Sequence, residues 1–269
     1  MARIAANAAL LAALMVVAAP LVWMVSASLL PDGGATKLPP VFIPDSPTLV
    51  QYAKLFARMD FGRYFLNSLI VAGSVTVGGL VVNSMAAFAF AKYRFAGRDK
   101  LFGALLALLV IPGQVTMFPV FLLLNKIHLT NHFGGLIVPA LANIFGIFLF
   151  RQFIANIPDS LIEAARIDGC DDFGIYARIV MPLCMPIVVT LALFTFLGTW
   201  NDFLWPLIVL ADDDLYTLPV ALANLLGEHV QDTELMMAGS VITVLPVLGL
   251  FVALQRYYIA GIMSGALKD

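Results

Sequence analysis

Long apolar stretches, separated by shorter polar ones, cover most of this chain of 269 residues. A helix that crosses a bilayer needs about 20 largely apolar residues, and each stretch reaches that length. We therefore predict an all-α membrane protein with six transmembrane helices. The predicted spans are residues 5–30, 64–91, 101–124, 134–155, 183–209 and 236–258.

Three spans contain residues that interrupt a helix or carry charge. Pro112 and Gly113 break the third span, and Pro246 lies in the sixth. Backbone carbonyls freed at Pro112 must bond to protein or water, which fits a gate or cavity lining, or equally a simple kink. Asp202 follows Trp200 late in the fifth span, so we place it at the outer interface, where aromatic residues gather.

The chain before the second span divides into three parts. Residues 5–30 form an apolar run longer than the 7–15 residues of a signal peptide, so we interpret them as a retained anchor. Residues 31–47 are rich in proline and glycine, which predicts irregular chain. Residues 48–63 carry apolar residues at helical spacing between basic ones, which fits an interfacial helix or, alternatively, a plain linker.

The composition agrees with a polytopic membrane protein, because 61% of residues are hydrophobic and only 12% are charged. The net charge of −2 says nothing about nucleic acid, but we see no basic patch and therefore expect no nucleic-acid partner. Cys170 and Cys184 fall on the predicted cytoplasmic side, where thiols stay reduced, so we expect no disulfide. His128 and His132 have no third ligand nearby, so we expect no metal site.

The basic residues predict the orientation. Six spans put both termini on one side, and that side holds most of the basic residues: Arg3, Lys92, Arg94, Arg98, Lys100, Arg151, Arg166, Arg178, Arg256 and Lys268. Loops rich in Lys and Arg stay in the cytoplasm. We therefore place both termini, and the polar segment 156–182, in the cytoplasm.

Segment 156–182 begins with the signals of a short helix. Pro158 suits the first turn of a helix. Ser160 and Glu163 match a capping box, in which the glutamate reaches back to the N-cap amide. Gly169 falls where a helix ends in the left-handed conformation.

A second helix should follow this turn. Asp171 and Asp172 can cap it, and Pro182 should stop it. Ala164 and Ala165 in the first helix allow another surface to approach closely. The resulting hairpin is too small for an active site but suits a groove on a soluble partner.

The spacing within the hairpin is specific. Glu163-Ala164-Ala165 is followed after three residues by Gly169, after nine more by Ile179, and after two more by Pro182. This pattern, between two spans of a six-span chain, resembles the signature loop of the permease subunit of bacterial ABC importers. Met181 stands where that family usually has leucine, a departure that leaves packing intact.

Further motifs resemble the carbohydrate branch of this family, the maltose and glycerol-phosphate type. The resemblance covers nearly everything from Tyr52 onward. It rests on Tyr64–Ser68, Phe95–Arg98, Ile111–Gln114, Ile157-Pro158, Ile167–Gly169, Trp200–Leu207, Gln255–Ile259 and Ser264–Lys268.

The resemblance implies a single permease domain over residues 1–269 that moves a sugar or sugar-like solute by alternating access. Its hairpin would be a cytoplasmic coupling helix between spans four and five that docks on an ATPase. Glu163 would pair with a basic residue of the ATPase, Ala164 and Ala165 would enter its cleft, and Gly169 would permit the turn. Asp168, Ile179 and Pro182 complete the implied docking motif.

The same resemblance implies the partners. They are a cytoplasmic ATPase dimer, a second permease subunit that we expect to be a different chain, an extracytoplasmic solute-binding protein and the lipid of the bacterial inner membrane. No lysine here follows a glycine, so the chain lacks a Walker A loop and is not itself an enzyme. It would bind no cofactor, and the partner ATPase would bind ATP and Mg²⁺.

Polar residues inside the spans are candidates for the translocation path, although many such residues only bond helices together. They are Asn67, Asn83, Gln114, Asn143, Thr195 and Asn201, with Pro112 and Gly113 as a gate or kink. An importer of a non-sugar solute remains an alternative. An ion-coupled secondary transporter fits less well, because it should show ionisable residues at mid-bilayer or an inverted repeat.

Overall fold

The computed structural model describes residues 2–228 and 232–266. Every regular element in these residues is helical, as predicted. Contacts divide the chain into two compact units: Met1–Leu66 with Thr217–Gly249, and Asn67–Tyr216 with Leu250–Asp269. The prediction of one permease domain over residues 1–269 stays a prediction.

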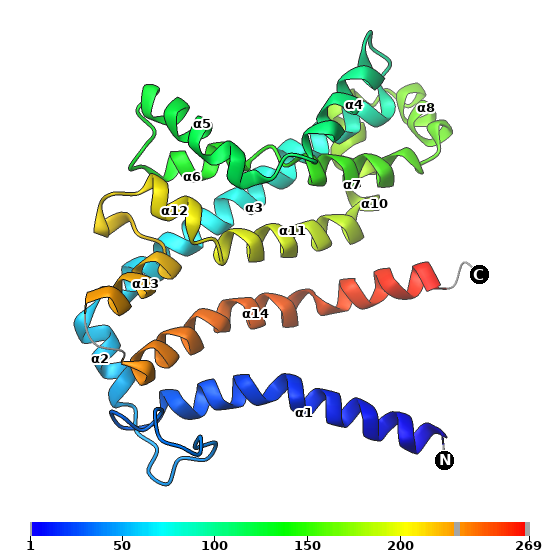
Figure 1. Ribbon diagram of the computed structural model, residues 1–269. Helices are drawn as coiled ribbons and strands as arrows, with labels where there is room; N and C mark the ends of the chain where they lie inside the picture. The colour runs from blue at the N-terminus through cyan, green and yellow to red at the C-terminus, as the bar shows by residue number, and fades with distance from the viewer. Residues whose placement is uncertain (1, 229–231, 267–269) are drawn as a thin grey trace. The chain divides into compact units, whose positions relative to one another are not determined.

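The first unit contains the N-terminal helix and the polar segment after it (Figure 1). Its apolar window in Ala6–Ser28 has no buried residue, so this helix presents apolar side chains on all sides. The proline-rich segment that follows is irregular, and a helix then forms over Val50–Arg58, which excludes the plain linker. The unit comprises α1 (Ala2–Ser28), α2 (Val50–Arg58), the start of α3 (Phe61–Lys92), α13 (Leu218–Glu228) and the start of α14 (Thr233–Ala266).

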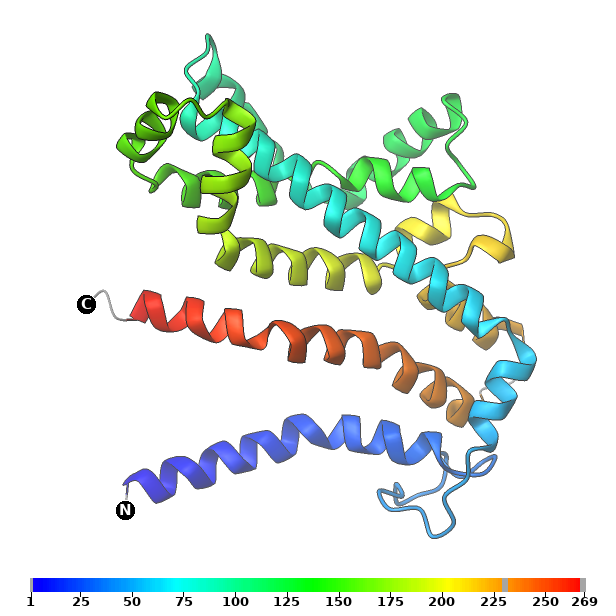
Figure 2. The ribbon, with the colours of Figure 1, turned by 180° about the vertical axis from the view of Figure 1, so that it is seen from behind.

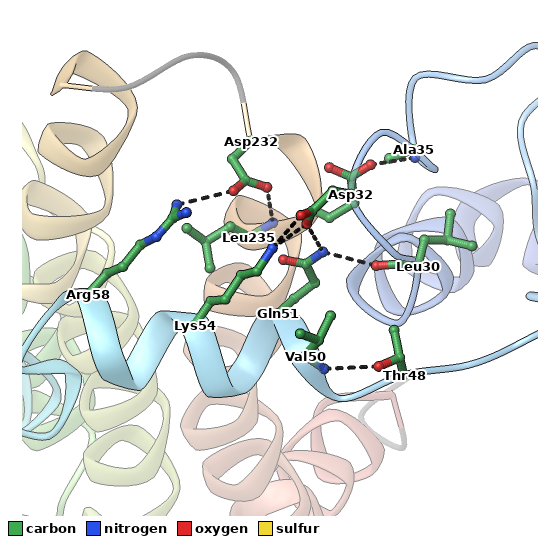
Figure 3. A network of polar contacts seen from close by, with 11 residues as sticks. Leu30, Asp32, Ala35, Thr48, Val50, Gln51, Lys54, Arg58, Asp232 and Leu235 are labelled. Atoms are coloured by element: carbon green, nitrogen blue, oxygen red, sulfur yellow. Dashed lines mark hydrogen bonds and ion pairs between the residues drawn. The ribbon is translucent and has the colours of Figure 1, made fainter.

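A polar network joins α2 to the segment before it and to the start of α14 (Figure 3). The buried Gln51 donates to Asp32 at 2.9 Å, and Lys54 also pairs with Asp32. The hydrogen bond from Lys54 lowers the pKa of the Asp32 carboxyl. Arg58 pairs with Asp232 at 3.2 Å. The network therefore fixes α2 against two segments that are distant in sequence.

The second unit contains most of α3 and the shorter helices. Two clusters of buried apolar residues hold it together, one around Phe150 and one around Val75. The elements are α4 (Arg98–Leu108), α5 (Gly113–Lys126), α6 (Phe133–Ala140), α7 (Ile144–Ala155), α8 (Asp159–Ile167), α9 (Asp172–Ile175), a π-helical turn (Tyr176–Val180), α10 (Met181–Leu183), α11 (Met185–Trp200), α12 (Leu204–Val209) and a 3₁₀ turn (Asp213–Leu215).

Within the described residues, four helices are long and apolar enough to cross a membrane: Ala6–Ser28, Phe61–Lys92, Phe133–Ala155 and Thr233–Ala253. Two sharply bent pairs bring the number to six if each pair is one span. One pair is Arg98–Leu108 with Gly113–Lys126, bent by 105°, and the other is Asp172–Leu183 with Met185–Trp200, bent by 80°.

The third predicted span, residues 101–124, is therefore not one helix, and a simple kink at Pro112 is wrong. The amides of Leu109, Val110 and Ile111 bond to carbonyls three residues back, so α4 ends in a tight turn. Pro112 has no N–H to continue the ladder and takes an extended ψ of 133°. Gly113 then begins α5.

The fifth predicted span, residues 183–209, is also broken. Its helix α11 ends at Trp200, and α12 begins at Leu204. Between the two helices, the Asp202 carboxylate accepts a hydrogen bond from the Trp205 amide at 3.4 Å. Trp200 is only 1% exposed and stacks on Phe196 with ring centroids 5.5 Å apart. Trp200 therefore lies in the core instead of the aromatic belt that its sequence position predicted.

Candidate docking hairpin and membrane cavity

The predicted hairpin begins with α8. This helix starts at Asp159, one residue before Ser160, which the capping box would make the N-cap. Pro158 is the N-cap and has no side-chain cap bond, while its carbonyl accepts from the Leu161 amide at 3.2 Å. Ser160 lies inside the helix. The predicted capping box between Ser160 and Glu163 is therefore wrong, because the fixed φ of proline already starts the helix.

The base of the hairpin is held by the last residue of α3. Lys92 donates to the Ile157 carbonyl and pairs with Asp159 at 2.7 Å. The lysine side chain is 6% exposed, although the aspartate is largely exposed. The hydrogen bond from Lys92 lowers the pKa of the Asp159 carboxyl, because it stabilises the charged form.

The turn after α8 has the geometry expected at Gly169. Its φ is +82°, and no neighbouring side chain or backbone atom lies within 4 Å of the position that a Cβ would take. The Cys170 amide donates to the Ala165 carbonyl at 2.9 Å, and the Gly169 amide donates to the Arg166 carbonyl at 3.1 Å. These two bonds form a Schellman motif, so glycine is required for backbone conformation and not for space.

The second helix of the hairpin starts as predicted but does not stop at Pro182. Asp171 is its N-cap and accepts from the Gly174 amide at 2.9 Å. The helix then passes through the π-helical turn and α10 and ends at Leu183, after which the chain bends into α11 (Figure 2). We attribute the tolerance of Pro182 to the wide π turn, which removes the tight i−4 carbonyl that a proline ring would meet.

One face of the hairpin belongs to the main core of the second unit. Ile162 is 4% exposed, and Ile175 and Val180 are fully buried. The Tyr176 hydroxyl shares a buried 2.7 Å hydrogen bond with Ser84 of α3. Ile179 is partly buried and packs against the same cluster, which includes residues of α3, α4, α7 and α11. The hairpin is therefore built onto the ends of the membrane helices.

The opposite face of the hairpin is open. Glu163, Ala164 and Asp168 are exposed, as is Pro182 in α10. Ala165, expected from its motif to enter the partner's cleft, is 7% exposed and lies in the chain's own core. Ala164 is thus the accessible alanine of the pair.

Two exposed apolar side chains on this open face were missing from the predicted site. Ile167 is 86% exposed and Phe173 is 66% exposed. The sequence could have predicted them, because apolar residues on the polar side of a capped hairpin indicate contact with another protein.

Three of the predicted path residues meet at a second feature. Asn83, Asn143 and Thr195 line a cavity of about 90 Å³ together with three phenylalanines. Asn83 accepts from the Asn143 amide at 2.9 Å, and Asn143 accepts from the Gly146 amide at 3.1 Å. These bonds cap α7 and hold a break in the fourth predicted span at residues 141–143.

The depth of this cavity follows from helix geometry. Asn83 lies nine residues before Lys92, the last residue of α3, which corresponds to about 14 Å along a helix. The apolar core of a bilayer is about 30 Å thick. With Lys92 at one edge of the apolar core, the cavity lies near mid-bilayer.

The other predicted path residues do not line this cavity. Asn67 is 7% exposed and donates to the carbonyls of Asp214 and Tyr216, so it holds a loop. Asn201 is exposed and donates to the Leu197 carbonyl. The remaining candidates, Gln114, Pro112 and Gly113, are exposed around the break between α4 and α5.

In the described part of the chain, the cysteines form no disulfide, and His132 has a structural role. Cys170 and Cys184 are free thiols. His132 caps α6 by accepting from the Gly134 amide at 3.0 Å. Among the described residues, no group of His, Cys, Asp and Glu could hold a metal ion. Lys268, which entered the orientation argument, lies outside the described residues.

Comparison with known proteins identifies the family. The family model described as the binding-protein-dependent transport system inner membrane component matches residues 79–263. The arabinooligosaccharide transport permease AraQ of Halalkalibacterium halodurans is 38% identical over 229 residues, which are 85% of this chain and 82% of the relative. The sn-glycerol-3-phosphate transport permease UgpE of Escherichia coli is 33% identical over 206 residues, 76% of this chain and 73% of that relative.

The fold is also known. A chain in the crystal structure of a bacterial ABC transporter that imports the acidic polysaccharide alginate superimposes with a TM-score of 0.84. It is 23% identical in sequence, and the match covers 94% of this chain and 95% of the other. The protein therefore belongs to the binding-protein-dependent transport system inner membrane components, the permease subunits of ABC importers.

Proposed function

We propose that this chain carries a neutral sugar across the bacterial inner membrane by alternating access, driven by an ATPase that docks on the α8–α9 hairpin. The ATPase binds ATP and Mg²⁺ and performs the hydrolysis. The names of two relatives support a sugar, because they are permeases for arabinooligosaccharides and for α-glucosides.

The two-faced hairpin is the observation that carries this proposal. Its inner face shares a core with α3, α7 and α11, and its outer face presents Glu163, Ala164 and Ile167 to another protein. A carboxylate beside an apolar side chain suits a cleft with a basic residue and an apolar floor. A partner that moves the outer face therefore moves the ends of the membrane helices.

The lining of the cavity at Asn83, Asn143 and Thr195 suits an uncharged solute, but its volume of about 90 Å³ is below the roughly 300 Å³ of a ligand pocket, so the cavity would have to widen during transport to admit a sugar. Its amide and hydroxyl groups can bond to sugar hydroxyls, and its aromatic rings can pack against the faces of a sugar ring. No charged side chain lines it within the described residues, so nothing there would balance a phosphate. This lining favours a neutral sugar over glycerol phosphate.

The remaining partners follow from the family and from α1. Six large apolar side chains between Leu10 and Val17 are at least 60% exposed, so α1 requires lipid or a second permease subunit around it. We place both termini and the hairpin in the cytoplasm. The solute-binding protein would then deliver the sugar from the opposite side, and the second permease subunit, a different chain, would supply the other hairpin for the ATPase dimer.

The docking role is tested by reconstituting the importer with its ATPase and solute-binding protein. Glu163→Gln should lower solute-stimulated ATP hydrolysis and uptake by about tenfold or more, because a hydrogen bond to a charged group is worth about 1.5–3 kcal/mol. Asp45→Asn, which removes the same charge from an exposed position in the irregular segment 31–47, should change neither rate. Equal uptake by the two variants would refute docking through Glu163.

The solute class is tested separately in the same vesicles. Neutral oligosaccharides should be taken up, and sn-glycerol-3-phosphate should not. Uptake of the phosphate ester alone would overturn the proposal of a neutral sugar and would leave the docking role of the hairpin intact.

A further inference from the structure

A groove of about 620 Å³ lies where α3 ends and α4 begins. Four basic residues and two acidic residues line it, which leaves a formal charge of +2: Lys92, Arg94, Arg98, Lys100, Asp99 and Asp159. We call it the α3–α4 groove. The expectation that the chain has no basic patch is wrong here: the four basic residues lie close together in the sequence, between Lys92 and Lys100, and line one groove.

Both acidic residues of the groove are already paired. Lys92 pairs with Asp159 at 2.7 Å, and Arg98 pairs with Asp99 at 2.9 Å. Arg94 and Lys100 are exposed, and neither has an ion pair with any described residue. Two cationic side chains therefore remain available at the mouth of the groove for an anion from outside the chain.

We place the groove at the level of lipid headgroups, because it lies between two apolar helices. Lys92 ends α3 and Arg98 begins α4, and a charged segment that joins two such helices suits a membrane surface. Phe95 is 43% exposed between the basic residues and contacts Phe90 with ring centroids 5.9 Å apart. An aromatic side chain among cations suits the boundary between headgroups and acyl chains.

We propose that the α3–α4 groove binds the phosphate of an anionic phospholipid, such as phosphatidylglycerol. The Arg94 guanidinium can donate two parallel hydrogen bonds to a phosphate, and Lys100 adds a point charge. Phe95 contacts the glycerol end of the lipid. The Lys92–Asp159 pair connects the groove to the first turn of α8, so a bound lipid stabilises the base of the docking hairpin.

The proposal is tested on the intact importer, purified in mild detergent from membranes that contain phosphatidylglycerol. Native mass spectrometry counts the phospholipids that each complex retains. One basic residue near an anionic membrane surface contributes about fivefold to binding, so Arg94→Gln with Lys100→Gln should lower retention by about thirtyfold. Lys37→Gln with Lys126→Gln removes the same charge from exposed positions elsewhere and should retain the lipid. Arg94→Lys with Lys100→Arg should also retain it.

Each other outcome overturns the proposal in a different way. Equal retention by the Arg94/Lys100 double glutamine variant and by wild type means that the groove binds no lipid. Displacement of the lipid by millimolar inorganic phosphate assigns the groove to free phosphate. Unchanged lipid retention together with loss of the ATPase from the complex assigns the two cations to the partner protein.

Discussion

Gly169 allows the sharpest test of the hairpin, because the cost of its backbone conformation can be separated from the cost of steric crowding. The residue has a φ of +82°, and no neighbouring atom lies within 4 Å of the place where a Cβ would lie. Gly169→Ala therefore meets no steric obstacle from the fold. Its cost is the left-handed backbone alone, about 1–2 kcal/mol for a residue that has a Cβ.

Part of this cost is offset in the unfolded chain. Alanine has fewer unfolded conformations than glycine, which contributes about 0.4–1 kcal/mol in its favour. The net destabilisation of the turn is then about 1 kcal/mol, or roughly a fivefold rise in local opening. Gly169→Asn should cost less, because asparagine tolerates this conformation, and Gly169→Val should cost more.

Hydrogen exchange measured by mass spectrometry on the intact importer reads this opening directly. The amides of Gly169 and Cys170 close the Schellman motif. Peptides that cover them should therefore exchange faster than in wild type, least in Gly169→Asn, more in Gly169→Ala and most in Gly169→Val. Gly103→Ala is the control, because Gly103 lies in the middle of α4 with no contact within 4 Å and should gain helix propensity. Unchanged exchange in Gly169→Val would refute the conclusion that the left-handed turn limits the stability of the hairpin.

Four further changes probe other contacts. Ile167→Ala removes three exposed carbons that we place against the ATPase, so ATPase affinity measured by pull-down should fall by about thirtyfold; unchanged affinity would remove Ile167 from the interface. Asp171→Ala removes the N-cap of α9 and should cost about 1 kcal/mol, visible as faster exchange of the amide that it caps, whereas equal exchange would contradict the cap. Because Lys92 holds the pKa of Asp159 below its ordinary value of 3.8, this pair stabilises the hairpin above about pH 4, and the contribution is lost as the pH falls through the lowered pKa. Asp159→Asn should abolish that acid-dependent part of hairpin opening, and an identical pH profile would refute it. Thr195→Val keeps the shape of the cavity but removes a hydroxyl, so the KM for sugar uptake should rise by up to about tenfold with normal assembly, and an unchanged KM would exclude contact with the solute.

The features of the hairpin that could be predicted from sequence depend on local chemistry. Gly169 adopts the left-handed turn and Asp171 caps α9, because both preferences involve only a few neighbouring residues. The capping box at Ser160 was a competing local signal, and Pro158 prevailed because its ring fixes the helix start. Local signals thus predict that a helix boundary exists more reliably than which residue forms it.

The features that could not be predicted require a distant partner. The break at residues 141–143 lies in an apolar stretch and is stabilised by Asn83, which accepts a hydrogen bond from the Asn143 amide 60 positions later. Ala165 looks equivalent to Ala164 in the motif, yet the fold buries only Ala165. Both outcomes depend on which surfaces pack together, and a single sequence does not contain that information.

Adjacent residues of α3 connect the two parts of the site. Ser84 bonds to Tyr176 in the hairpin at 2.7 Å, and Asn83 beside it bonds to the Asn143 amide at the cavity at 2.9 Å. A displacement of the hairpin therefore reaches the cavity through two adjacent residues of α3, without a longer chain of intermediate contacts. Because buried hydrogen bonds are costly to leave unmade, α3 should follow the hairpin instead of releasing Tyr176. The motion of the docked ATPase would then change the geometry of the cavity directly, which is the mechanical link that alternating access requires.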